Sequence, residues 1–181
     1  MLNQRSQLDL FLLLEDALLA IGGYVDLYES KDSAFVPRYL GWLKQLEGKL
    51  RDNRVAKAAV VSSCRASILS VSGQVHRDKL SKRKQVANHA ADTIQVLQQE
   101  LLEVFTPLEN KLARVRDMLR KLLVIYSALR PQGFALVQDI ACLWQAMTEL
   151  DELRGGVMEL ASQLPKHDLL RLLGEEVAGL S

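Results

Sequence analysis

The feature that most constrains the fold is a long seam of apolar residues between Ile94 and Leu129. Its members are separated by three or four residues, the spacing that puts side chains on one face of an α-helix. The seam consists of Ile94, Leu97, Leu101, Val104, Leu108, Leu112, Val115, Leu119, Leu122, Tyr126 and Leu129. It predicts a long helical arm over about residues 84–130.

Pro107 interrupts this seam and leaves two interpretations open. Thr106, Pro107 and Glu109 match the N-cap, first and third positions of a new helix, so the arm can be read as two helices. The seam continues across the proline with a single change of phase, which favours one helix with a kink. We expect the kinked helix.

The rest of the chain is also expected to be helical. Apolar residues repeat at helical spacing, and no segment has the alternation of a strand. The expected helices cover about residues 6–29, 37–51, 53–75, 134–163 and 165–178, with Asp52 or Asn53 as the N-cap of the third. We therefore expect an all-α fold: an elongated, mostly antiparallel bundle of five to six helices, forming a single domain over residues 1–181.

Composition fits an ordinary globular protein. Of the 181 residues, 49% are apolar and 25% are charged, which suffices for a continuous core and argues against disorder. The sequence has no stretch of roughly 20 apolar residues, so no transmembrane segment is expected, and its start lacks the pattern of a secretory signal. The two cysteines, Cys64 and Cys142, are too few and too distant for a disulfide framework. We expect buried thiols in a cytoplasmic protein.

Charge is sorted along the chain although the total is only +1. Residues 1–35 carry a net charge of −4, residues 36–90 carry +9, residues 91–132 carry +1 and residues 133–181 carry −5. The positive block is densest at Arg77, Lys79, Lys82, Arg83 and Lys84. Two interpretations stay open: a site for an anionic partner, or a solvated turn that complements the acidic ends of the chain.

No motif in the sequence predicts catalysis, a metal or a cofactor. Three histidines and two distant cysteines do not form a zinc ligand set, and no glycine-rich phosphate loop is present. His89 is the best candidate for a phosphotransfer histidine, but Asp92 stands where a basic residue would steady a phosphoryl group. We therefore expect a protein that is not an enzyme.

The leading functional hypothesis is a non-enzymatic adaptor, chaperone or scaffold that binds another helix or forms a homodimer. The wide apolar run on the arm is the expected partner surface, and its residues are Leu119, Leu122, Leu123, Ile125 and Tyr126. One alternative is a binder of nucleic acid or another anionic surface through residues 77–84. The other is a degenerate phosphotransfer-type signalling bundle that uses His89.

Overall fold

The computed structural model describes residues 5–73, 79–130 and 139–179, and these form seven α-helices without a strand. The expected all-α fold, with one long helix over the apolar seam, is confirmed. The described residues contain seven helices rather than five or six, because the described part of the segment expected as one helix over residues 134–163 contains two.

The first four helices are α1 (Gln7–Glu29), α2 (Phe35–Asp52), α3 (Ala58–Gly73) and α4 (Lys79–Leu129). The chain reverses between α1 and α2, and again between α2 and α3, at residues in the left-handed region: Lys31 has φ 56° and Arg54 has φ 55°. Asn53 does not begin α3 as expected; it is the C-cap of α2, with its backbone N–H bonded to the end of that helix.

α4 is a single helix of 51 residues that continues through Pro107. Proline has no N–H and would leave a carbonyl of the preceding turn without its helical partner, which costs stability but does not end the helix here. The buried seam residues on both sides of the proline explain why: Leu101 and Leu112 are both covered, so packing holds the helical conformation. The expectation of one helix rather than two is confirmed.

The chain divides into two compact units. The terminal unit combines Met1–Phe11 with Pro107–Ser181, and the four-helix unit consists of Leu12–Thr106. Each unit has its own buried apolar residues. The expected single domain stays a prediction, because it concerns how the two units act together.

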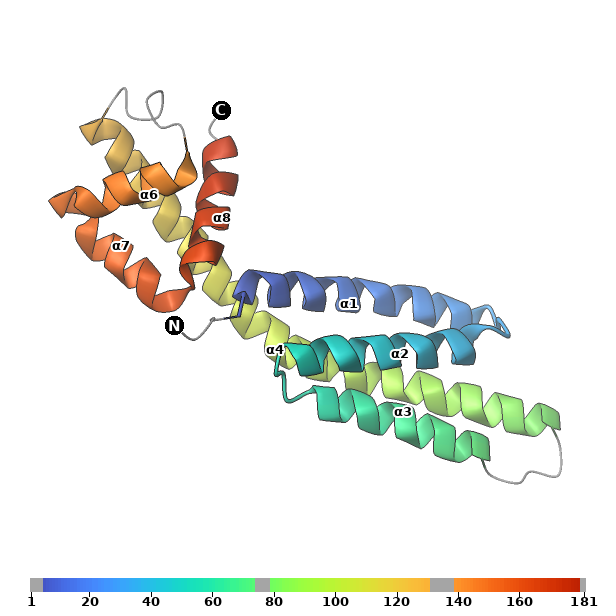
Figure 1. Ribbon diagram of the computed structural model, residues 1–181. Coiled ribbons are helices and arrows are strands. Elements are labelled where there is room, and N and C mark those ends of the chain that lie inside the picture. Colours follow the sequence, from blue (N-terminus) through green and yellow to red (C-terminus); the bar gives the residue numbers. More distant parts are fainter. Residues whose placement is uncertain (1–4, 74–78, 131–138, 180–181) are drawn as a thin grey trace. The chain divides into compact units, whose positions relative to one another are not determined.

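In the four-helix unit, α1, α2, α3 and the first part of α4 lie side by side (Figure 1). Phe35, Tyr39, Leu43 and Leu50 of α2 are almost fully buried. The Tyr39 hydroxyl lies 3.2 Å from the Thr93 hydroxyl of α4, so the one polar atom of this ring has a partner inside the core. Burial raises the pKa of Tyr39 to about 12.

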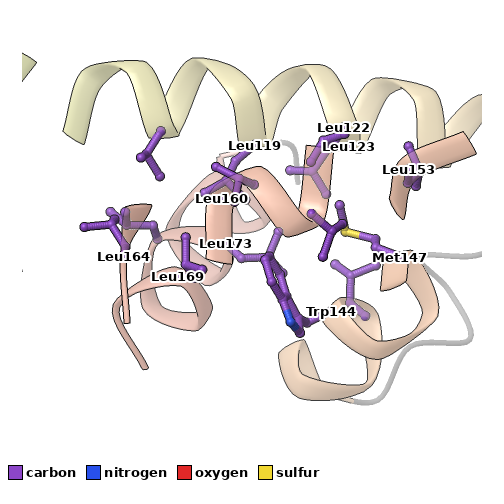
Figure 2. Packing of buried hydrophobic residues seen from close by; sticks show 14 of the residues in the cluster. Leu119, Leu122, Leu123, Trp144, Met147, Leu153, Leu160, Leu164, Leu169 and Leu173 are labelled. Atoms are coloured by element: carbon purple, nitrogen blue, oxygen red, sulfur yellow. The ribbon is translucent and has the colours of Figure 1, made fainter. Parts of the chain in front are cut away.

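In the terminal unit, the second part of α4 packs against α6 (Ile140–Glu149), α7 (Asp151–Gln163) and α8 (Lys166–Ala178). Figure 2 shows Leu119, Leu122 and Leu123 of α4 facing apolar side chains of these three helices. Trp144 and Met147 of α6 belong to the same core.

The prediction of one continuous helix over residues 134–163 is wrong. Leu150 has φ −83° and ψ 121°, an extended conformation that ends α6 and precedes α7. Asp139 begins α6, since its side chain accepts the N–H of Ala141 at 3.3 Å. One extended residue lets two short helices each bury an apolar face, whereas apolar spacing alone reads across the break. Residues 134–138 of the expected helix lie outside the described residues.

Candidate functional site

The main concave feature described in the four-helix unit is an open cleft of about 880 Å³. It is formed by the end of α1, the turn into α2, the start of α2, the end of α3 and the start of α4. Its lining residues are Tyr28, Glu29, Lys31, Asp32, Ser33, Phe35, Val36, Pro37, Ser72, Lys82, Arg83, Lys84, Val86, Ala87 and Asn88. The volume lies in the range of sites that hold small ligands or side chains of a partner.

Three residues of the expected anion-binding cluster lie on this cleft: Lys82, Arg83 and Lys84, which we call the basic wall. Arg83 and Lys84 are exposed and Lys82 is half-buried. Within the described part of the chain, none of the three forms an ion pair. Of the other two cluster residues, Lys79 is the first residue of α4, and Arg77 lies outside the described residues.

The position of the basic wall is unfavourable for the helix itself. Residues 82–84 follow closely on the N-terminus of α4, where the helix dipole is positive, and the first turn contains no acidic residue. Cations there lower helix stability by a few tenths of a kcal/mol each. The three cations give this side of the cleft a positive potential, which favours a bound anion.

Several other cations of the basic block are paired, in contrast to the basic wall. The carboxylate of Glu47 binds Arg51 at 2.5 Å and Arg65 at 3.0 Å, and its side chain is only 7% exposed. Burial by itself would raise the pKa of Glu47, but a hydrogen bond from Ser62 and the charges of Arg65 and Arg51 lower it. Lys57 pairs with carboxylates of α4 in the same way. These residues stabilise the bundle, and their charge is already compensated.

Two carboxylates of α8 are also paired, with arginines of α4. Arg116 binds Glu175 at 2.6 Å, and Arg120 binds Glu176 at 2.6 Å. Burial would raise the pKa of Glu176, but hydrogen bonds from Arg120 and Arg116 lower it. These contacts all lie inside the terminal unit, where they join α4 to α8.

The two sides of the cleft are held in a defined arrangement. The Tyr28 hydroxyl at the end of α1 donates to Asn88 Oδ1 of α4 at 3.1 Å. Asp32 Oδ1 accepts the backbone N–H of Ala34 at 2.8 Å, which fixes the turn into α2. Lys31, in its left-handed conformation, donates its N–H to the Tyr28 carbonyl at 2.9 Å. These bonds order the cleft before any ligand binds, which reduces the entropy that binding must remove.

The expected partner surface on the arm is mostly covered by the chain's own helices. Leu119, Leu122, Leu123 and Tyr126 are at most 6% exposed and belong to the core of the terminal unit. Ile125 is 43% exposed and is the one residue of that set on the surface. The apolar spacing correctly predicts a buried face of α4, but this face packs against α6, α7 and α8 of the same chain. The expected homodimer stays a prediction.

The other chemical candidates have ordinary surroundings. His89 is half-buried, and its Nε2 lies 3.1 Å from the Ser67 hydroxyl. The prediction of buried thiols is confirmed for Cys64, whose pKa burial raises, and is wrong for Cys142, which is exposed on α6. Over residues 5–73, 79–130 and 139–179, no group of three or more histidine, cysteine or acidic side chains is arranged to hold a metal ion. No helix in these ranges is long and apolar enough to cross a membrane.

The sequence predicts the basic wall but not the other residues of the cleft. Tyr28, Lys31 and Asp32 look like an ordinary polar helix end, and Asn88 has no distinctive context. The left-handed conformation of Lys31 normally selects glycine or asparagine, so a lysine there gives no signal of the turn in the sequence.

Comparison of this chain with protein-family models, with curated proteins and with solved structures finds no match. Function is therefore inferred from the geometry and charge of the cleft.

Proposed function

We propose that this protein is a non-enzymatic binding module that holds an acidic segment of a partner protein in the cleft. The observation that carries the proposal is the basic wall: three neighbouring cations on a concave surface, without an ion pair among the described residues. Charge complementarity of this kind steers association and sets specificity. The apolar residues beside the wall provide contact area for the partner's own apolar side chains.

The lining favours a protein segment over nucleic acid. Proteins that bind single strands offer aromatic rings on which bases stack. Here Phe35 is 2% exposed, and Tyr28 is half-buried with its ring centroid 5.5 Å from that of Phe35. The cleft also contains two carboxylates, Glu29 and Asp32, which repel a continuous phosphate backbone.

A charge-reversal experiment tests the proposal. A fluorescein-labelled peptide of alternating Glu and Leu is titrated with the wild-type protein and with the triple variant Lys82→Glu, Arg83→Glu and Lys84→Glu, and binding is followed by fluorescence anisotropy. We expect binding by the wild type that weakens with added salt, and a loss of at least about tenfold in affinity for the variant.

The matched control reverses three exposed cations of the same unit that do not line the cleft: Lys44, Lys49 and Arg54. Its change in net charge is identical, so it separates the cleft from long-range attraction by the whole protein. We expect the control to bind within about threefold of the wild type. Equal losses in both triple variants, or the absence of any binding by the wild type, contradict the proposed site.

A further inference from the structure

The cleft carries positive and negative side chains on different elements. The basic wall belongs to α4. Glu29 at the end of α1 and Asp32 in the turn into α2 present carboxylates, and we call these two residues the acidic lip. The exposed Lys31 stands between them in the sequence and offsets part of their charge. Glu29 and Asp32 are exposed, and neither forms an ion pair with a described residue. The cleft therefore carries charges of both signs rather than a uniformly positive lining.

Apolar side chains line the cleft together with these two charged regions. Val36 and Pro37 come from the start of α2, and Val86 and Ala87 come from α4. Val36 and Ala87 are half-buried and Pro37 is exposed, so part of their surface is available to a ligand. An apolar residue of a bound segment would bury area here and fix the position of the charges on either side of it.

The Asp32 carboxylate of the acidic lip is held in place by the backbone. Asp32 Oδ1 accepts the N–H of Ala34, which leaves the second carboxylate oxygen of Asp32 for another partner. The backbone N–H of Asp32 itself donates to the Leu27 carbonyl at 3.0 Å. A carboxylate fixed in this way loses little entropy when it pairs with a cation.

From these features we infer that the cleft recognises a dipolar segment: acidic side chains bind the basic wall, an apolar side chain packs between, and a basic side chain binds the acidic lip. The inference rests on the proposed function and adds the basic residue to the ligand. The basic wall and the acidic lip both contribute to specificity. The acidic lip repels a polyanion, and the basic wall repels a polycation.

The test compares two labelled peptides that differ only at one end. The dipolar peptide has two Glu, two Leu and two Lys in succession, and the acidic peptide has Gln in place of both Lys; each is made in both chain directions. In the better direction, we expect the wild type to bind the dipolar peptide about fivefold more tightly than the acidic one, as two exposed ion pairs would provide.

Two protein variants separate this inference from the proposed function. Glu29→Gln with Asp32→Asn removes the lip charges and keeps an acceptor for the Ala34 N–H. We expect this variant to bind both peptides equally, while the triple basic-wall variant binds neither. Equal binding of the two peptides by the wild type, or an unchanged preference in the lip variant, overturns the dipolar ligand and leaves the proposed function standing. Undiminished binding by the basic-wall variant overturns both, as does tighter binding of a single-stranded oligothymidylate than of either peptide.

Discussion

Asp168 in α8 caps the N-terminus of α1: its Oδ2 atom accepts the backbone N–H of Gln7 at 2.7 Å, across 161 residues of sequence. The same oxygen accepts the N–H of Leu8 at 3.3 Å, and Oδ1 accepts the Ser6 hydroxyl at 2.6 Å. Ser6 in turn accepts the N–H of Asp9 at 2.9 Å. The Asp168 side chain is 1% exposed, and of its donors the Leu8 N–H is buried and the Ser6 and Gln7 groups are half-buried. Within the terminal unit, these bonds join the first residues of α1 to α8.

Asp168→Ala is expected to lower the unfolding free energy of the terminal unit by about 1–3 kcal/mol, since buried donors lose their acceptor. Fluorescence of the buried Trp144 during urea unfolding measures the change in this unit. Ser6→Ala is the milder comparison, because it removes one hydroxyl and leaves the carboxylate on the backbone N–H groups. Unchanged unfolding of Asp168→Ala would show that the cap does not stabilise the unit.

Two adjacent glycines of α7 should respond differently to alanine. A Cβ on Gly156 would lie 2.7 Å from Leu122 Cδ2 of α4, whereas a Cβ on Gly155 meets nothing within 4 Å. Gly155→Ala is expected to raise stability by about 1 kcal/mol through helix propensity. Gly156→Ala should lose that gain, because Leu122 must leave its packed position. Urea midpoints of the two variants check this, and equal stabilisation would contradict the close α4–α7 contact.

The four-helix unit should lose stability at alkaline pH because of Tyr39. Burial raises its pKa to about 12 from 10.0, so the unfolded chain ionises first and the unfolding free energy falls as pH rises from 10 to 12. Two pKa units correspond to about 2–3 kcal/mol. In Tyr39→Phe this part of the fall is absent. The comparison uses urea unfolding followed by Trp42 fluorescence at several pH values. If the unfolding free energy falls equally with pH in the wild type and in Tyr39→Phe, the burial of the Tyr39 phenol is contradicted.

Lys31 and Arg54 form a matched pair of left-handed residues in the same unit, with φ 56° and 55°. Lys31→Gly and Arg54→Gly each relieve about 1–2 kcal/mol of backbone strain in the folded state. The added glycine also makes the unfolded chain more flexible, which lowers the unfolding free energy by roughly 0.4–1 kcal/mol. Both variants are therefore expected to be as stable as the wild type or slightly more so. Only Lys31→Gly removes a cation from the cleft, so only it should weaken binding of the acidic peptide. Equal effects on binding would argue against a contribution of Lys31 to the site.

The helices were largely predictable because their apolar spacing is local. Leu97, Leu101, Leu112 and Val115 are all buried, as the seam predicts. Apolar spacing does not encode which helix covers a face. For this reason the sequence predicts a partner surface at Leu119, whereas α6, α7 and α8 of the same chain cover this residue. The break at Leu150 has no signal, since leucine favours helix and only the tertiary packing requires one extended residue there.

The candidate site was predictable only on one side. A cluster of cations stands out in the sequence because like charges are rarely placed together at a helix start. Tyr28 and Asn88 meet across 60 residues, and Asp168 meets Gln7 across 161. Contacts at such separations depend on the topology of the bundle, which residue types alone do not fix.

The most direct test of the binding cleft is a map of where the dipolar peptide contacts the protein. Backbone amide chemical shifts of the isotope-labelled protein, followed during titration with the peptide, identify the affected residues. We predict shifts concentrated at the basic wall, at residues 28–36 and at residues 86–88. Shifts concentrated instead at the exposed Val124, Ile125 and Leu129 of α4, with the cleft unaffected, would contradict the proposed binding site.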